Sequence, residues 1–89
     1  MEKFIVWGKY CDNAINKREP FREEHLNRLF SLKEKNILVT LGPTKCTRFL
    51  FAIFNANNKN NLREILEKDI YWQKGIWVSL EIFEWNQSF

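Results

Sequence analysis

The segment 48–54, Arg-Phe-Leu-Phe-Ala-Ile-Phe, is apolar at almost every position, and it constrains the fold more than any other part of the chain. A short apolar run rich in aromatic and branched residues is typical of a strand inside a sheet with both faces covered. The chain has 89 residues, which favours a single domain spanning residues 1–89. That domain must therefore supply a cover for each face of this strand.

Three further strands and two helices are predicted around this run, in the order βαββαβ. The other strands are Phe4–Tyr10, Ile37–Leu41 and Ile76–Trp85, while the helices run from about Pro20 to Lys35 and from Leu62 to Asp69. With right-handed crossovers, this order produces a four-stranded antiparallel sheet with both helices on one face. We therefore predict a ferredoxin-like α+β fold.

One face of such a sheet is left without helices. The third and fourth strands nevertheless carry bulky apolar residues on both faces, and hydrophobic residues make up 45% of the chain. A large exposed apolar surface usually marks an interface. We expect the open sheet face to pack against a second copy of the chain, forming a homodimer.

Binding to nucleic acid is the main alternative use of the open face. Some ferredoxin-like domains stack RNA bases on aromatic residues of the third strand, and Phe49 and Phe51 share one face of that strand. The net charge is only +3, however, and the glycine-bearing signature of RNA-binding domains is missing. Burial of these rings in a dimer is favoured, and no nucleic-acid partner is expected.

The remaining composition argues against several other classes of protein. No apolar run approaches the length of about 18 residues that spans a bilayer, and no signal-peptide pattern is visible, so we expect a cytoplasmic protein without a membrane partner. Cys11 and Cys46 lack metal-ligand spacing, and we interpret them as reduced thiols in preference to a disulfide. No metal site and no nucleotide cofactor is predicted, because no metal-ligand cluster or phosphate-binding loop is present.

His25 and Asp69 are the candidate catalytic residues. His25 falls on the predicted inward stripe of the first helix, and Asp69 ends the inward stripe of the second. An imidazole transfers protons at neutral pH, and a carboxylate bonded to one ring nitrogen would orient the ring. The alternatives are a packed core histidine and an aspartate that caps the turn at residues 70–74. The full predicted stripe of the first helix is Phe21, Arg22, His25, Leu26, Leu29 and Leu32.

Three residues are weaker candidates for binding a substrate. Arg22, one helical turn before His25, could hold a carboxylate or enolate-like oxygen, or instead form an ion pair with Glu19 or Asp69. Asp12 could lie at the rim of the same cleft or serve only as a turn residue. Tyr71 could line a small pocket or pack at an edge.

Four segments of the chain together resemble the YciI-like (YCII-related) family over nearly the whole length. They are Asp12 at the end of the first strand, Arg22-x-x-His25-Leu26, Gly42-Pro43 after the second strand, and Asp69-x-Tyr71 followed by Gly75. The resemblance implies a dimeric α+β barrel, in which two ferredoxin-like sheets pack face to face. It also implies an active site in which His25 and Asp69 act as acid–base residues.

A dehydrochlorinase acting on a chlorinated hydroxyquinol is similar, and muconolactone isomerases share the wider fold. The resemblance thus implies proton transfer of the lyase or isomerase type on a small carbonyl or enol substrate, without naming that substrate. A non-catalytic module that binds small anions, or a structural dimeric module, is the alternative. The chain departs from the family at Ile70, where proline is frequent, and in the short loop 42–48, which we expect to leave the cleft more open.

Overall fold

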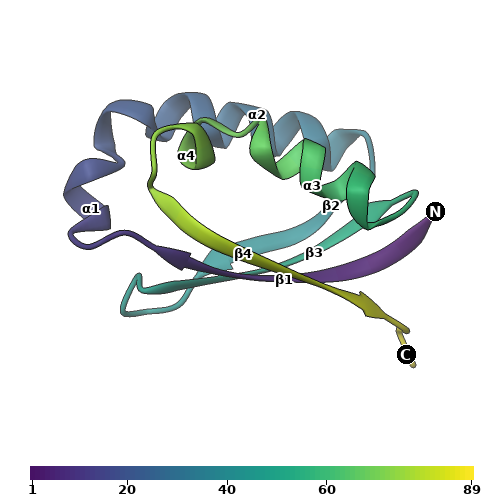
Figure 1. Cartoon of the computed structure of the whole chain (residues 1–89). Coiled ribbons are helices and arrows are strands. Elements are labelled where there is room, and N and C mark those ends of the chain that lie inside the picture. The colour runs from purple at the N-terminus through teal and green to yellow at the C-terminus, as the bar shows by residue number, and fades with distance from the viewer.

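The computed structural model describes all 89 residues as one twisted antiparallel sheet with helices on a single face (Figure 1). The strands are ordered β2-β3-β1-β4 across the sheet. The predicted ferredoxin-like α+β fold is therefore confirmed. The strands are β1 (Glu2–Tyr10), β2 (Leu38–Pro43), β3 (Phe49–Ala56) and β4 (Trp77–Trp85), and the helices are α1 (Ala14–Lys17), the 3₁₀-helix η1 (Glu19–Phe21), α2 (Arg22–Glu34), α3 (Lys59–Glu67) and α4 (Ile70–Gln73).

Two elements differ from the predicted boundaries. The first long helix begins at Arg22, because Pro20 lies in the preceding turn of 3₁₀-helix, and the short helix α1 was not predicted. The second strand continues through Gly42 to Pro43, where we had expected those residues to end it. β2 is an edge strand, so the missing N–H of Pro43 can face away from the only neighbouring strand.

The core lies between the helices and the covered face of the sheet. Leu50, Ala52 and Phe54 of β3 are almost fully buried on this face, in keeping with period-two alternation. Leu62 and Leu66 of α3 are buried as well, and α3 is anchored at its start by Asn58, whose side chain accepts the Asn61 N–H at 2.8 Å. Burying each large aliphatic side chain contributes about 1.5–3 kcal/mol.

The other face of the sheet carries no helix (Figure 1). Trp7, Phe51 and Phe83, from three adjacent strands, lie on this face with 37%, 39% and 49% of their surfaces exposed. Trp7 is paired with Phe51 across the sheet, and its ring also stacks on Phe49 at a centroid distance of 5.3 Å. We call the exposed rings of Trp7, Phe51 and Phe83, together with the partly buried ring of Phe49, the open-face patch.

The inward stripe of α2 is narrower than predicted. His25 and Leu32 are buried, but Leu26 is 44% exposed and Arg22 is exposed. Successive residues of a helix are rotated by about 100°, so a stripe centred on His25 and Leu32 turns Leu26 and Arg22 toward solvent. Arg28, which was not predicted to face inward, is partly buried at the edge of the same stripe.

No helix is long and apolar enough to cross a membrane.

Candidate active site

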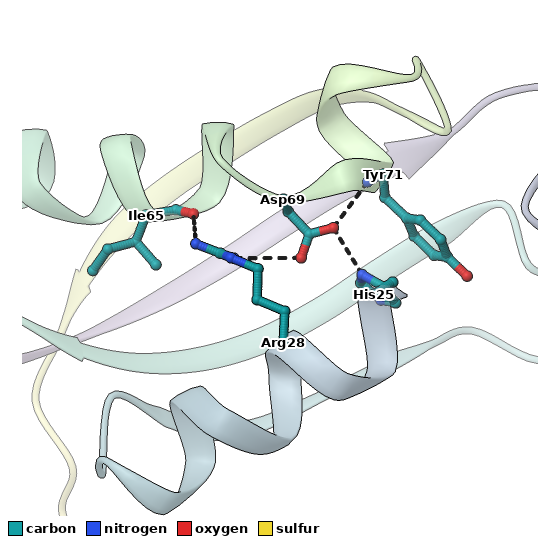
Figure 2. Close-up of polar contacts among 5 residues, drawn as sticks. All are labelled: His25, Arg28, Ile65, Asp69 and Tyr71. Atoms are coloured by element: carbon teal, nitrogen blue, oxygen red, sulfur yellow. Dashed lines mark hydrogen bonds and ion pairs between the residues drawn. The ribbon is translucent and has the colours of Figure 1, made fainter. Parts of the chain in front are cut away.

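His25 and Asp69 meet in the core between α2 and the segment that links α3 to α4 (Figure 2). The Nδ1 atom of His25 lies 2.8 Å from Oδ1 of Asp69. The two residues are only 3% and 1% exposed. The structure thus brings together the two residues that were predicted to share a site, and their hydrogen bond is shielded from water.

Asp69 is held by contacts on both of its oxygens. Its Oδ1 also accepts the backbone N–H of Tyr71 at 2.9 Å, so Asp69 is the N-cap of α4 as well as the partner of His25. On the other side, Nη1 of Arg28 lies 3.5 Å from Oδ2, while Nη2 of Arg28 donates to the carbonyl oxygen of Ile65 at 2.7 Å. Both contacts considered for Asp69, the bond to His25 and the cap of the turn at residues 70–74, are therefore present at once.

These contacts decide the tautomer of a neutral His25. The carboxylate of Asp69 is an acceptor and already accepts one N–H at Oδ1, so Nδ1 of His25 must carry the proton that is donated to it. The lone pair of the neutral ring then resides on Nε2. Nε2 makes no hydrogen bond within the chain. The side-chain nitrogen and oxygen atoms that are fully enclosed and lack a partner are Arg18 Nε, Asp69 Oδ2 and Trp77 Nε1. Since Nε2 also lacks a partner but is not among these enclosed atoms, it keeps some contact with solvent.

Two aromatic rings fix the plane of the imidazole. Tyr71 stacks on His25 at a centroid distance of 3.6 Å with an interplanar angle of 9°, and Trp77 meets the imidazole edge-on at 5.3 Å. Tyr71 and Trp77 are themselves perpendicular at 5.8 Å and almost fully buried. The ring of His25 therefore has little freedom to rotate.

The aromatic contacts continue toward the end of β1. Tyr10 pairs with Trp77 across the β1–β4 register. Burial raises the pKa of Tyr10, although the nearby Trp77 N–H and the positive charge of Arg18 oppose the rise. Burial likewise raises the pKa of Tyr71, against the opposing charges of Arg18 and Arg22. Both phenols are therefore protonated at neutral pH and can act as donors.

A cavity of about 470 Å³ opens at this end of β1, between α1 and the β2–β3 hairpin. Tyr10, Asp12 and Ala14 form one side of it, and Arg48 and Phe49 form another. His25 does not line the cavity, but Tyr10 does. Tyr10 is paired with Trp77 across the sheet, and Trp77 in turn contacts the imidazole. The cavity and the His25–Asp69 pair are thus joined by buried aromatic side chains.

The structure separates the predicted binding residues. Tyr71 lies against His25, whereas Asp12 is exposed at the wall of the cavity. Arg22 is exposed, lines a surface pocket with Glu23 and Leu26 and makes no ion pair with Asp69, whereas Arg28 occupies the place beside Asp69 that we considered for Arg22.

Sequence reasoning missed Arg18, Arg28 and Trp77. Arg28 had a signal, since it lies one helical turn after His25 on the same side of α2. Nothing in the local sequence distinguished Arg18 or Trp77 from other residues of their type.

Both cysteines line the cavity as free thiols. The hydroxyl of Thr44, 3.3 Å from the sulfur of Cys46, lowers the pKa of that thiol, and the backbone N–H of Arg48 adds to the effect. No group of three or more His, Cys, Asp or Glu side chains is placed to hold a metal ion.

Comparisons with known proteins agree with this architecture. A 5-chloro-2-hydroxyhydroquinone dehydrochlorinase from Burkholderia phenoliruptrix AC1100, solved in complex with 2,5-dihydroxybenzoquinone, is similar in structure with a TM-score of 0.82 and 20% sequence identity, covering 97% of this chain and 95% of that one. At this identity the likeness shows the fold. No curated protein matched the sequence. The model of the YCII-related domain matches residues 2–86, and the chain therefore belongs to the YCII-related (YciI-like) family.

Proposed function

We propose that this protein is a small acid–base enzyme that moves a proton on a carbonyl or enol substrate, in a lyase or isomerase reaction. The observation that carries the proposal is the buried hydrogen bond of 2.8 Å between His25 Nδ1 and Asp69 Oδ1, which leaves Nε2 as the free basic atom. His25 is the proton carrier, and Asp69 is the positioning residue that fixes its tautomer. No cofactor is needed for this chemistry.

The proton transfer has two steps. Nε2 first removes a proton from a carbon or hydroxyl group next to a carbonyl, leaving an enolate-like anion and an imidazolium whose charge is stabilised by Asp69. The imidazolium then returns the proton to a different atom of the substrate in an isomerase. In a lyase, a leaving group such as a halide departs from the anion with its bonding electrons, and the imidazolium releases its proton to solvent, which restores the neutral ring.

Burial of the pair agrees with this role and sets a condition on it. A dry environment strengthens the electrostatic interaction between Asp69 and the imidazolium. Because His25 is only 3% exposed, a substrate reaches Nε2 only where that atom contacts solvent. Tyr71, whose ring lies flat on the imidazole, covers the face of the ring and leaves the lone pair of Nε2 in the ring plane.

The similar structure supports the class of reaction. That protein is a dehydrochlorinase, and the compound in its complex is a dihydroxybenzoquinone. Chlorinated hydroxyquinols are therefore the first substrates to try with this chain, followed by muconolactones and dienelactones.

The proposal includes a homodimer that forms through the open face of the sheet. The open-face patch exposes Trp7, Phe51 and Phe83 side by side, and two such faces packed together would bury these rings in a homodimer. The two free thiols fit a reducing compartment, and we infer a cytoplasmic location.

The test is turnover with matched variants. Wild-type protein should release chloride from 5-chloro-2-hydroxyhydroquinone, or incorporate solvent deuterium into a muconolactone, as measured by ion chromatography or NMR. His25→Gln should abolish this activity, and Asp69→Asn should lower it by about 10²- to 10⁴-fold. Glu67→Gln, an exposed change two residues from Asp69, is the control and should leave activity intact.

Two outcomes would contradict the proposal. If His25→Gln is as active as wild type on any of these substrates, the histidine is not the proton carrier. If wild type turns over none of them while His25→Gln and Asp69→Asn lose only stability, the pair is a structural feature of the core. If wild type nevertheless binds these compounds without converting them, the protein is better described as a small-anion-binding module.

A further inference from the structure

Both cysteines of the chain line one cavity, although they lie far apart in the sequence. Cys11 directly follows β1, and Cys46 lies in the turn between β2 and β3. Both are free thiols. The structure thus places two oxidisable groups at the wall of one cavity of about 470 Å³, and the proposed reaction at His25 uses neither of them.

Backbone hydrogen bonds at this end of the sheet bring the two cysteines to neighbouring positions. The N–H of Tyr10 donates to the carbonyl oxygen of Arg48 at 2.9 Å, which continues the antiparallel β1–β3 register by one residue. Cys11 lies one residue beyond that bond on one side and Cys46 two residues beyond it on the other, at the same end of the sheet (Figure 1). The same register sets Cys11 opposite Thr47, the residue next to Cys46.

This spacing is close to that of a disulfide. Opposed Cα atoms of antiparallel strands are about 4.5–5.5 Å apart, and a disulfide joins Cα atoms about 4.4–6.8 Å apart. Cys46 is exposed in its turn, so a bridge from Cys11 to the neighbour of its opposed residue requires only an adjustment of that turn. The two thiols can therefore be joined without moving the sheet.

The two thiols differ in their surroundings. Cys46 is exposed, and the hydroxyl of Thr44 lies 3.3 Å from its sulfur, whereas Cys11 is half-buried. The Thr44 hydroxyl and, to a smaller extent, the backbone N–H of Arg48 lower the pKa of the Cys46 thiol. The thiolate is the reactive form of cysteine, so an oxidant from solvent should attack Cys46 first and leave Cys11 as the second thiol.

We propose that Cys46 and Cys11 form an oxidative modification site, at which a hydroperoxide converts the two thiols to a reversible disulfide. The Cys46 thiolate attacks one peroxide oxygen, the O–O bond breaks, and the departing hydroxide takes a proton to become water, leaving a sulfenic acid. The sulfur of Cys11 then attacks the sulfur of Cys46, and the sulfenic hydroxyl leaves as water with the Cys11 proton. The bridge ties the β2–β3 turn to the end of β1 at the cavity wall.

This inference goes beyond the proposed function and does not depend on it. Transient disulfides inside cells are usually catalytic or redox-sensing, so the pair is compatible with thiols that rest in the reduced form. A thiol reductant reverses the bridge by exchange. The site can be tested without any substrate of the His25–Asp69 pair.

The test is oxidation of the reduced protein by one equivalent of hydrogen peroxide, followed by intact mass, peptide mapping and thiol counting. Wild type should lose both thiols, form an internal Cys11–Cys46 bridge, and recover both thiols with dithiothreitol. Cys11→Ser should stop at a sulfenic acid on Cys46, which dimedone traps. Cys46→Ser should react with peroxide about tenfold more slowly than wild type.

A second measurement tests the activation of Cys46 by Thr44. In the Cys11→Ser background, where Cys46 is the only thiol, the pH dependence of alkylation by iodoacetamide reports the pKa of Cys46. Thr44→Val removes the hydroxyl and should move this midpoint to higher pH. Thr40→Val, an exposed change in β2 away from both thiols, is the matched control and should leave the midpoint unchanged.

Four results would overturn the site. They are wild-type thiols that survive peroxide, a disulfide that joins two chains in place of an internal bridge, a Cys46→Ser protein that reacts as fast as wild type, or an unchanged midpoint in Thr44→Val. If Cys11→Ser fails to fold, Cys11→Ala removes the same thiol, and the absence of a dimedone adduct on that variant would equally reject Cys46 as the attacking residue.

Discussion

Replacing Asp69 by alanine should destabilise the fold far more than a typical surface change. The substitution removes the hydrogen bond of 2.8 Å to His25, the N-cap bond of 2.9 Å to the Tyr71 N–H, and the contact of 3.5 Å with Arg28. It also leaves a buried ring N–H and a buried backbone N–H without an acceptor. The loss therefore includes the desolvation of these donors.

The magnitude follows from the separate contacts. A hydrogen bond to a charged group contributes about 1.5–3 kcal/mol, and a helix cap about 0.5–2 kcal/mol. Relief of the buried charge of Asp69 offsets part of this sum, so we expect the free energy of unfolding to fall by about 3 kcal/mol. For a domain of this size, that loss lowers Tm by about 12–24 °C.

Urea and thermal unfolding of Asp69→Ala, Asp69→Asn and the exposed control Glu67→Ala would measure the effect. Asparagine caps helices about as well as aspartate, so Asp69→Asn should keep the Tyr71 contact and lose only about 1–2 kcal/mol. A value for Asp69→Ala within about 0.5 kcal/mol of the Glu67→Ala control would refute the idea that Asp69 anchors both neighbours.

Three further predictions concern packing, pH and assembly. Gly8→Ala should destabilise by about 1–3 kcal/mol in urea unfolding, because the added Cβ meets two leucine side chains and a backbone oxygen at 2.8–2.9 Å, whereas Gly42→Ala meets no atom within 4 Å and should be neutral. Burial raises the pKa values of Tyr10 and Tyr71 in the folded state, so folding favours the protonated phenols. Their contribution to the free energy of unfolding is fully present below about pH 10 and should decline as the pH rises further, with a smaller decline in Tyr71→Phe. Phe51→Glu places a charge in the open-face patch and should convert a dimer to monomers by light scattering; a monomeric wild type at micromolar concentration would reject the dimer.

The sequence predicted the fold well because its strongest signals are periodic. The apolar run of the third strand required cover on both faces, and alternation in that strand accounts for both the buried Leu50 and the exposed Phe51. The ends of elements were less predictable. Whether Pro43 ends a strand depends on its being at an edge, and strand order is a property of the whole sheet.

The candidate site was predicted in part for a related reason. Helical counting placed His25 and Asp69 inward, and both are buried. It could not fix the centre of the inward stripe of α2, so only Arg22 was considered as a neighbour of Asp69, where the structure places Arg28. Contacts between distant segments, such as Tyr71 stacked on His25, depend on how α4 docks and leave no periodic signal.

The most direct test of the account is the protonation pattern of the His25 ring, measured by nitrogen-15 NMR. The chain has one histidine, so the ring signals need no assignment by mutation. The account predicts that the neutral ring carries its proton on Nδ1 and a lone pair on Nε2, and that Asp69→Asn disturbs this preference. A neutral ring protonated on Nε2 in the wild-type protein would contradict an imidazole that Asp69 orients to act as a base.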